Sequence, residues 1–222
     1  MSRRARIRPE RFAARHRRGA ESRAAILEAA ECIFAEAGLG GARTDAITAR
    51  AGVNKALLYY YFKSKDALYH AILEDHLKEF RCRILEVLSG EGGARAKVLG
   101  YVSVHFDFIG SRPCYPRLLQ RLVMTGGRSL DRLAREFFAP VYRKLTSVIK
   151  EGVRTGEFRK LNSDHAALSL AALIVFYFSA APMLSAVAHV DPYAKTQLAR
   201  RKEEVLKFIR YALFKNGKEV GA

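Results

Sequence analysis

The segment that decides the fold runs from residue 44 to residue 65, with the sequence TDAITARAGVNKALLYYYFKSK. Gly52 interrupts its helical pattern, because glycine readily adopts the left-handed conformation that ends a helix. Asn54 can then cap a second helix by accepting a hydrogen bond from an N–H group of the first turn. The segment therefore predicts short helices over 44–51 and about 55–61, joined by a turn, which is a helix-turn-helix.

The two faces of the predicted second helix differ in chemistry. Leu58 and Phe62 share one face and are expected to pack on Ile26, Phe34 and Ile47 as a core. The opposite face is available to DNA. It carries one cation, two small or aliphatic side chains and three hydroxyl groups: Lys55, Ala56, Leu57, Tyr59, Tyr60 and Tyr61.

Helical spacing continues on both sides of this segment, and alternating strand patterns are nearly absent. A first helix is expected from a Ser22 cap to Gly38, and a long helix from a Ser64 cap to a glycine-rich break at 89–93. Further helical stretches are separated by proline and glycine and cover 94–109, 116–125, 129–155, 163–188 and 194–215. The chain is therefore expected to be all-α, with an N-terminal three-helix domain over 21–66 and a larger helical domain over 67–222.

The charge of the chain is strongly positive and unevenly distributed. It has 39 Lys and Arg against 22 Asp and Glu, a net charge of +17, which favours polyanionic partners. Residues 1–20 hold eight Arg and one Glu with few apolar side chains, so they are expected to form a basic disordered arm. Two uses of the arm stay open: a nonspecific electrostatic tail, or insertion of Arg3, Arg4 or Arg6 into a minor groove.

Cysteine spacing and hydropathy bear on the cellular location of the protein. Three widely spaced cysteines form no CxxC pattern, and the first twenty residues hold no apolar run typical of a signal peptide, so a cytoplasmic location is expected. Residues 166–188 are uncharged and close in length to a helix that spans a bilayer, but Pro182 interrupts them. A buried core helix is the favoured interpretation, and no membrane partner is expected.

Patterns typical of catalysis or metal binding are missing from the sequence. His105 and Asp107 lie two residues apart on a helix and do not face each other, and His70 and His76 lack the i, i+4 spacing of paired ligands. No nucleophile motif or phosphate-binding loop occurs. Neither enzymatic activity, nor a metal, nor a cofactor is therefore expected.

The N-terminal domain resembles the tetracycline-repressor (TetR/AcrR) family of transcriptional regulators over residues 22–72. The segments that carry the resemblance are Ile26-Leu27-Glu28-Ala29-Ala30, Gly38, Ile47, Ala51-Gly52-Val53-Asn54-Lys55 and Leu58-Tyr59-Tyr60-Tyr61-Phe62-Lys63-Ser64-Lys65. The resemblance implies a homodimer with one recognition helix per subunit in successive major grooves of a palindromic operator in double-stranded DNA. It also implies a C-terminal domain that binds a small-molecule effector and dimerises through its last two long helices. Repression is the commoner outcome in the family.

The resemblance also implies a set of DNA contacts. Phosphate contacts would fall at Thr44, Tyr59, Tyr61 and Lys65, and base contacts mainly at Lys55, Ala56, Leu57 and Tyr60. Arg43 and Asn54 complete the expected DNA-binding set. The chain departs from the family at Ala56-Leu57, where Gly-Thr is frequent, and at Ala42-Arg43, where Thr-Thr is frequent. Leu57 is therefore expected to make an apolar contact with DNA, with simple packing as the alternative.

A sensing pocket is predicted in the larger domain. His105 lies at helical spacing among Val98, Val102 and Ile109, so it is either a satisfied core histidine or part of a ligand pocket. In the second case aromatic side chains would line the same pocket and favour a mostly apolar or aromatic effector: Phe106, Phe137, Phe138, Tyr142, Phe176 and Tyr177.

The dimer surface is expected on the uncharged helix near 163–181 and on the last helix, whose apolar side chains are Leu198, Val205, Leu206, Ile209 and Leu213. These features predict a dimeric DNA-binding repressor that an effector releases from its operator. The alternative is a nonspecific nucleic-acid or membrane-surface binder. Only the regulator would bind an inverted repeat orders of magnitude more tightly than random DNA.

Overall fold

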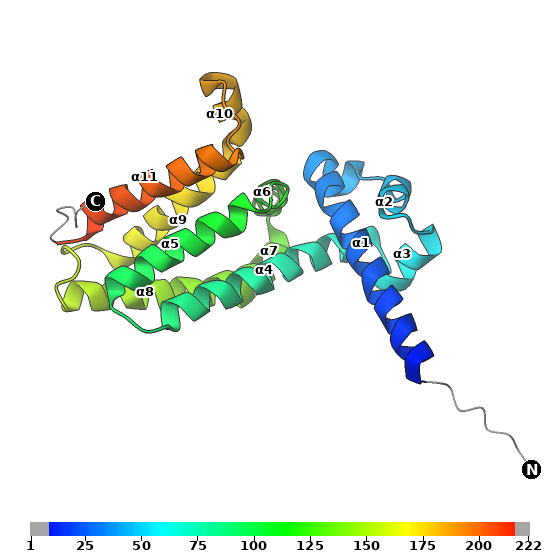
Figure 1. Cartoon of the computed structure of the whole chain (residues 1–222), viewed down its shortest axis with the longest axis horizontal. Helices are drawn as coiled ribbons and strands as arrows, with labels where there is room; N and C mark the ends of the chain where they lie inside the picture. The colour runs from blue at the N-terminus through cyan, green and yellow to red at the C-terminus, as the bar shows by residue number, and fades with distance from the viewer. Residues whose placement is uncertain (1–8, 216–222) are drawn as a thin grey trace, which may run out of the picture. The chain divides into compact units, whose positions relative to one another are not determined.

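The computed structural model describes the backbone of residues 9–215 and the side chains of residues 19–215 (Figure 1). This part of the chain is helical and contains no β-sheet, in agreement with the all-α prediction. In chain order the elements are α1 (Pro9–Gly41), α2 (Thr44–Ala51), α3 (Lys55–Phe62), α4 (Lys65–Ser89), α5 (Ala94–Gly110), α6 (Tyr115–Thr125), α7 (Gly127–Leu133), the π-helical turn η1 (Ala134–Phe138), α8 (Ala139–Arg154), α9 (Ser163–Ser179), α10 (Ala181–Ala188) and α11 (Lys195–Leu213).

The chain forms two compact units, Met1–Leu73 and Glu74–Ala222. The division falls inside α4, later than the predicted domain boundary after residue 66. The difference arises because the first turns of α4 belong to the core of the first unit, where Leu68 is fully buried and Tyr69 packs edge-on against Phe34 at a centroid distance of 5.3 Å.

The helix-turn-helix forms as the sequence predicts. α2 ends at Gly52, which adopts the left-handed conformation with φ 65°. Asn54 caps α3, because its side-chain oxygen accepts a hydrogen bond of 2.8 Å from the Leu57 N–H group. Ser64 caps α4 in the same way, by accepting a hydrogen bond of 3.0 Å from the Ala67 N–H group.

The first helix is longer at both ends than the predicted range of Ser22 to Gly38. α1 begins at Pro9, so residues 9–20, which the sequence analysis assigned to a disordered arm, continue the helix. Proline is tolerated at a helix start because its missing N–H has no intrahelical partner there. Gly38 leaves the helical conformation, with φ 68° and ψ 178°, so it breaks α1 at the predicted position although the helix resumes to Gly41. Residues 1–8 lie outside the described part of the chain.

In the second unit, α8 and α9 pack against each other and against α5, and α11 lies beside α5 and α9 (Figure 1). Their facing side chains form one buried core that includes Val98, Leu145, Leu170 and Val205. Val205 and Ile209 point into this core, so two of the residues predicted for the dimer surface are covered within the protomer. The large apolar side chains that α11 leaves exposed are Phe208 and Tyr211.

Proline lies where two of the predicted helical stretches are divided. The stretch 129–155 is divided into α7, η1 and α8, because Pro140 has no N–H to donate to the carbonyl of Glu136. Arg81 Nη1 donates to that carbonyl instead, at 3.1 Å. The stretch 163–188 is divided into α9 and α10, with Pro182 in the first turn of α10.

The break between α9 and α10 bears on whether the uncharged segment 166–188 could span a bilayer. Between residues 9 and 215, no single helix is long and apolar enough to cross a bilayer. α9 and α10 meet that criterion only as a pair, and they are bent by 64°.

The turn between α8 and α9 joins three parts of the second unit. The Glu157 carboxylate accepts hydrogen bonds from the N–H groups of Ala94 and Arg95, at 3.1 Å and 3.0 Å, and so caps the start of α5. Phe158 stacks on Phe214 with a centroid distance of 5.4 Å, which fixes the end of α11 to the same turn. The two backbone bonds of α5 and the nearby Arg95 guanidinium lower the pKa of Glu157, against the effect of its partial burial.

Candidate nucleic-acid interface

The side chains of α3 divide into a buried and an exposed face. Leu58 is fully buried and Phe62 nearly so, which confirms the predicted core face of this helix. On the other face Lys55, Ala56 and Tyr59 are exposed, and Tyr60 exposes 75% of its surface. An eight-residue helix that keeps only two side chains in the core leaves most of its surface available to another molecule.

Lys55, the cation at the start of the exposed face, is paired with a carboxylate. Its Nζ lies 2.9 Å from Asp45 Oδ1 in α2, and both side chains are more than half exposed. The hydrogen bond and the charge of Asp45 raise the pKa of Lys55, and the same bond and the charge of Lys55 lower the pKa of Asp45. Asp45 could not be identified from the sequence, because it lies on a different helix from Lys55 and the ten-residue separation corresponds to no helical period.

The three consecutive tyrosines of α3 have different surroundings. Tyr59 and Tyr60 project into solvent. Tyr61 is half-buried, and its hydroxyl lies beside α1, 3.1 Å from the position that a Cβ on Gly19 would take. Tyr61 also packs edge-on against Tyr60 at 5.2 Å. Of the hydroxyl groups assigned to DNA, those of Tyr59 and Tyr60 are therefore the more accessible.

The other predicted DNA contacts surround the turns. Lys65 Nζ donates to the carbonyls of Ala42 and Gly40, at 3.0 Å and 3.3 Å, and so ties α4 to the turn before α2. Arg43 is exposed at the start of α2, and Thr44, the first residue of that helix, is half-buried. Asn54 is occupied as the cap of α3.

Leu57 is neither fully buried nor fully exposed. Its position on α3 is compatible with both interpretations made from the sequence, the apolar DNA contact and simple packing.

A strained turn connects α3 to α4. Lys63 has φ 61° and ψ −42°, one of two positive φ values among the described non-glycine residues. The Ser64 N–H group donates to the Phe62 carbonyl across it. A three-residue turn (γ-turn) whose central residue has a positive φ is rare and costs free energy. The packing on either side of Lys63 must therefore hold this turn in its conformation.

His105 of the second unit has the surroundings of a core histidine. It is buried, and its Nδ1 shares a hydrogen bond of 3.1 Å with the Tyr101 hydroxyl. The Phe80 ring lies 4.8 Å away. Burial lowers the pKa of His105 to about 3, so the ring is neutral at pH 7.

The aromatic residues predicted to line a ligand pocket have different surroundings. Phe106 is buried against Phe178 and Tyr177, with centroid distances of 4.9 Å and 6.0 Å. Phe137 is fully buried, while Phe138 lies 6.1 Å from Phe80. The remaining two are at the surface: the Tyr142 hydroxyl donates to Asp164 at 2.9 Å, and Phe176 exposes 66% of its surface.

The described side chains include no group of three or more His, Cys, Asp or Glu residues that could hold a metal ion. The arrangement on α2 and α3 is instead suited to contact a polyanion, because it presents a lysine and tyrosine hydroxyl groups from a short, rigidly capped helix.

Comparison with known proteins assigns both units. Residues 26–72 match the family model described as bacterial regulatory proteins, tetR family. Residues 95–209 match the model described as tetracyclin repressor-like, C-terminal domain, which covers more than half of the chain.

Individual proteins are similar over most of the chain. The transcriptional regulator RutR of Escherichia coli strain K12 is 29% identical over 164 residues, which is 73% of this chain and 76% of RutR. The transcriptional repressor NicS of Pseudomonas putida is 28% identical over 173 residues, 75% of this chain and 80% of NicS. The solved structure of the ketosteroid transcriptional regulator KstR2 of Mycobacterium tuberculosis superposes with a TM-score of 0.74 at 17% identity, over 87% of this chain and 95% of KstR2. The chain therefore belongs to the tetR family of bacterial regulatory proteins, which are helix-turn-helix transcription regulators.

Proposed function

We propose that this protein is a homodimeric repressor that binds an inverted-repeat operator and is released from it by a small, mostly apolar or aromatic effector. The exposed face of α3 is the observation that carries the proposal. Leu58 and Phe62 of this helix are buried, while lysine and tyrosine side chains cover the surface that a major groove would receive.

The residues at this surface divide into two roles. Lys55, Ala56, Leu57 and Tyr60 are assigned to base edges, since a lysine can reach guanine acceptors and an aliphatic side chain can contact a thymine methyl group. Arg43, Thr44, Tyr59, Tyr61 and Lys65 are assigned to the phosphate backbone, and Asn54 supports them as the cap of α3. Lys65 and Tyr61 would have to turn from their present neighbours to reach a phosphate.

Apolar side chains exposed on α9 and α11 support the homodimer. Leu168 and Phe176 on α9 and Phe208 and Tyr211 on α11 each expose more than half of their surface. A hollow of about 360 Å³ between the two helices is lined in part by Phe208. A second copy that packs on these helices would remove this apolar surface from water and bring two copies of α3 to one duplex.

The effector class rests on the aromatic clusters of the second unit. Phe106 borders one hollow beside α11, and Tyr177 borders another between α10 and α11. An effector lowers operator affinity only if it binds one conformation better than the other. We assign the connection to α4, because this single helix contributes residues to both units.

Repression is proposed because the relative NicS is named as a repressor, and a regulator that acts on DNA is expected to work in the cytoplasm. The rival function, nonspecific binding of nucleic acid or a membrane surface, is favoured only by the net charge of +17.

Selection from a random pool of duplex oligonucleotides distinguishes the two. The regulator should enrich an inverted repeat whose half-sites lie about one helical turn apart, and bind it at least about a thousandfold more tightly than scrambled duplex at moderate salt. Equal affinity for selected and scrambled duplexes would refute the proposal.

A further inference from the structure

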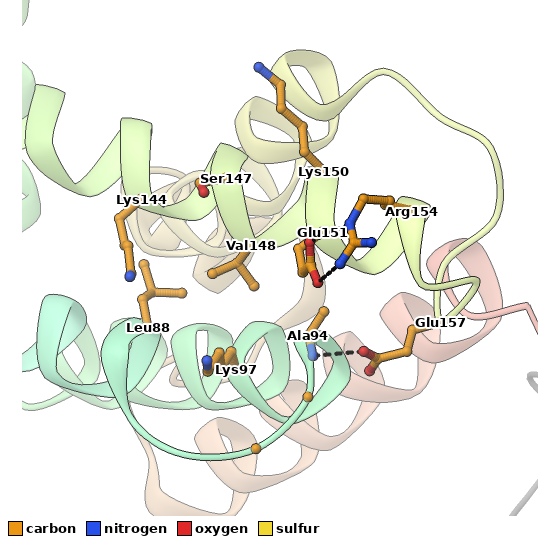
Figure 2. Close-up of a pocket in the computed structure, with 12 residues that line it drawn as sticks. Leu88, Ala94, Lys97, Lys144, Ser147, Val148, Lys150, Glu151, Arg154 and Glu157 are labelled. Atoms are coloured by element: carbon orange, nitrogen blue, oxygen red, sulfur yellow. Dashed lines mark hydrogen bonds and ion pairs between the residues drawn. The ribbon is translucent and has the colours of Figure 1, made fainter.

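The second unit has a pocket of about 540 Å³ between α5 and α8, at the end of α4 (Figure 2). Its apolar wall includes Leu88 and Val148, and its rim is formed by the glycine turn before α5. A volume of this size accepts a small metabolite. None of the residues predicted from the sequence to bind an effector lines it.

Two half-buried lysines face this pocket from opposite walls. Figure 2 shows Lys97 on α5 and Lys144 on α8, with the Lys144 side chain extending toward the wall that carries Leu88 and Lys97. Neither amine has an ion-pair partner among the residues that the structure describes. Two cations on one hollow repel each other unless an anion lies between them.

The carboxylates of the pocket are already engaged. Glu157 accepts the two N–H groups that begin α5. Glu151 pairs with Arg154 through bonds of 2.9 Å and 2.5 Å. The lining therefore has four cations against two carboxylates, and its cations without an ion-pair partner among the described residues are Lys97, Lys144 and Lys150. The Lys150 side chain points away from Leu88 and Ala94 (Figure 2), which leaves the first two lysines to act on a ligand.

We propose that this pocket binds a small anionic metabolite, whose phosphate or carboxylate group is held between Lys97 and Lys144 and whose apolar part lies against Val148. Ser147, exposed at the same wall, offers a hydroxyl donor to the anionic group. Charge-assisted hydrogen bonds from two ammonium groups supply the specificity for an anion. The site is separate from the predicted DNA face, because its residues all belong to the second unit.

The proposal is tested with the full chain by calorimetric titration at constant ionic strength in chloride. Pyrophosphate serves as the phosphate probe and citrate as the carboxylate probe, so their relative affinities identify the group that the pocket prefers. Saturable binding of one probe per chain is expected. Lys97→Gln and Lys144→Gln should each weaken that binding about tenfold, because each removes one charge-assisted contact.

Two control variants locate the binding. Lys150→Gln removes a charge from a side chain of α8 that points away from Leu88 and Ala94, and Lys55→Gln removes one from α3; both should leave the affinity within about twofold of the parent. If a pocket variant unfolds, Lys97→Arg and Lys144→Arg keep the charge and should retain binding.

The proposal is overturned if the parent chain binds neither probe saturably, or if the control variants lose as much affinity as the pocket variants. Operator selection on the same samples is a separate measurement, so failure of the anion site and failure of the proposed regulator function are distinguishable.

Discussion

The Asp45 carboxylate lies 2.9 Å from Lys55 Nζ. In the DNA-free protein, the lysine that is assigned to contact base edges is therefore already paired with a carboxylate. DNA must compete with this ion pair, and the Asp45 charge also repels phosphates near α3. An exposed ion pair is weak, so the competition is modest.

Asp45→Asn should therefore raise affinity for scrambled duplex by about two- to fivefold, since it frees Lys55 and removes a negative charge from the interface. Fluorescence anisotropy at fixed salt measures the change. Asp131→Asn makes the same change in net charge from an exposed position in the second unit and serves as the control. An equal gain from both variants would mean that the effect comes from overall charge and not from the pair with Lys55.

The backbone conformation of Lys63 has a cost in folding free energy that can be measured. Its φ of 61° and ψ of −42° are unfavourable for a side chain with a Cβ, and glycine adopts positive φ without this penalty. Lys63→Gly should increase the free energy of unfolding by about 1 kcal/mol, the strain released less the entropy that glycine adds to the unfolded chain. Urea denaturation measures it. Lys63→Gln keeps the strain and removes the charge, and it should leave stability within about 0.5 kcal/mol of the parent.

At the scale of elements, Glu157 shows how one side chain joins helices that are distant in sequence. Its carboxylate supplies the cap of α5, a helix that begins at Ala94 with no side-chain cap of its own from Gly93. Glu157→Gln replaces one accepting oxygen with an NH₂ group, so one N–H of α5 loses its partner. The variant should be less stable at pH 7 by about 1–2 kcal/mol.

The Glu157 contribution should also depend on pH. Because the folded pKa lies below the ordinary value of 4.5, the stabilisation is complete above that value and is lost as pH falls through the folded pKa. The stability gap between parent and Glu157→Gln should therefore be constant from pH 7 to about 5.5 and shrink below about 4.5. Glu91→Gln, at an exposed position in the loop before α5, controls for loss of a carboxylate. A gap that persists unchanged at pH 3 would show that the carboxylate charge plays no part.

Elements set by local chemistry could be predicted from the sequence, and those set by distant partners could not. The bounds of α2 and the Asn54 cap follow from a glycine and an asparagine at fixed offsets, which act within one turn. The Arg81 side chain that donates to the Glu136 carbonyl before Pro140 could not be predicted, because it lies 55 residues from that carbonyl. Periodicity records which face of a helix is apolar, and carries no information on the distant side chain that meets it.

The same distinction applies to the sites. The exposed face of α3 could be predicted, because burial of Leu58 fixes the orientation of the other side chains of a short helix. The pairing of Lys55 with Asp45 and the placement of Lys97 and Lys144 on one pocket depend on how separate helices cross. Phenylalanine and tyrosine, the residue types assigned to one pocket, also occur frequently in protein cores. Composition alone therefore did not separate the buried Phe137 from the exposed Phe176.

For the whole molecule, operator binding by an inverted repeat requires two copies of the chain, so the exposed apolar residues of α9 and α11 should control DNA affinity without touching DNA. Phe208 exposes 58% of its surface in the single chain, on the helix that also holds Val205 and Ile209 in the core. Phe208→Arg places a charge where the second copy is proposed to pack, and the cost of burying an unpaired charge disfavours the dimer.

The variant should be folded and monomeric at micromolar concentration by light scattering, and its affinity for the selected operator should fall at least about a hundredfold, because each half-site must then be bound separately. Met124→Arg makes a similar change at a methionine on α6 that is 81% exposed, and it should stay dimeric with operator affinity unchanged. A Phe208→Arg protein that remains dimeric and binds operator normally would place the dimer contact elsewhere on the second unit. If the variant is monomeric but keeps full affinity, α3 acts alone and the inverted-repeat proposal fails with it.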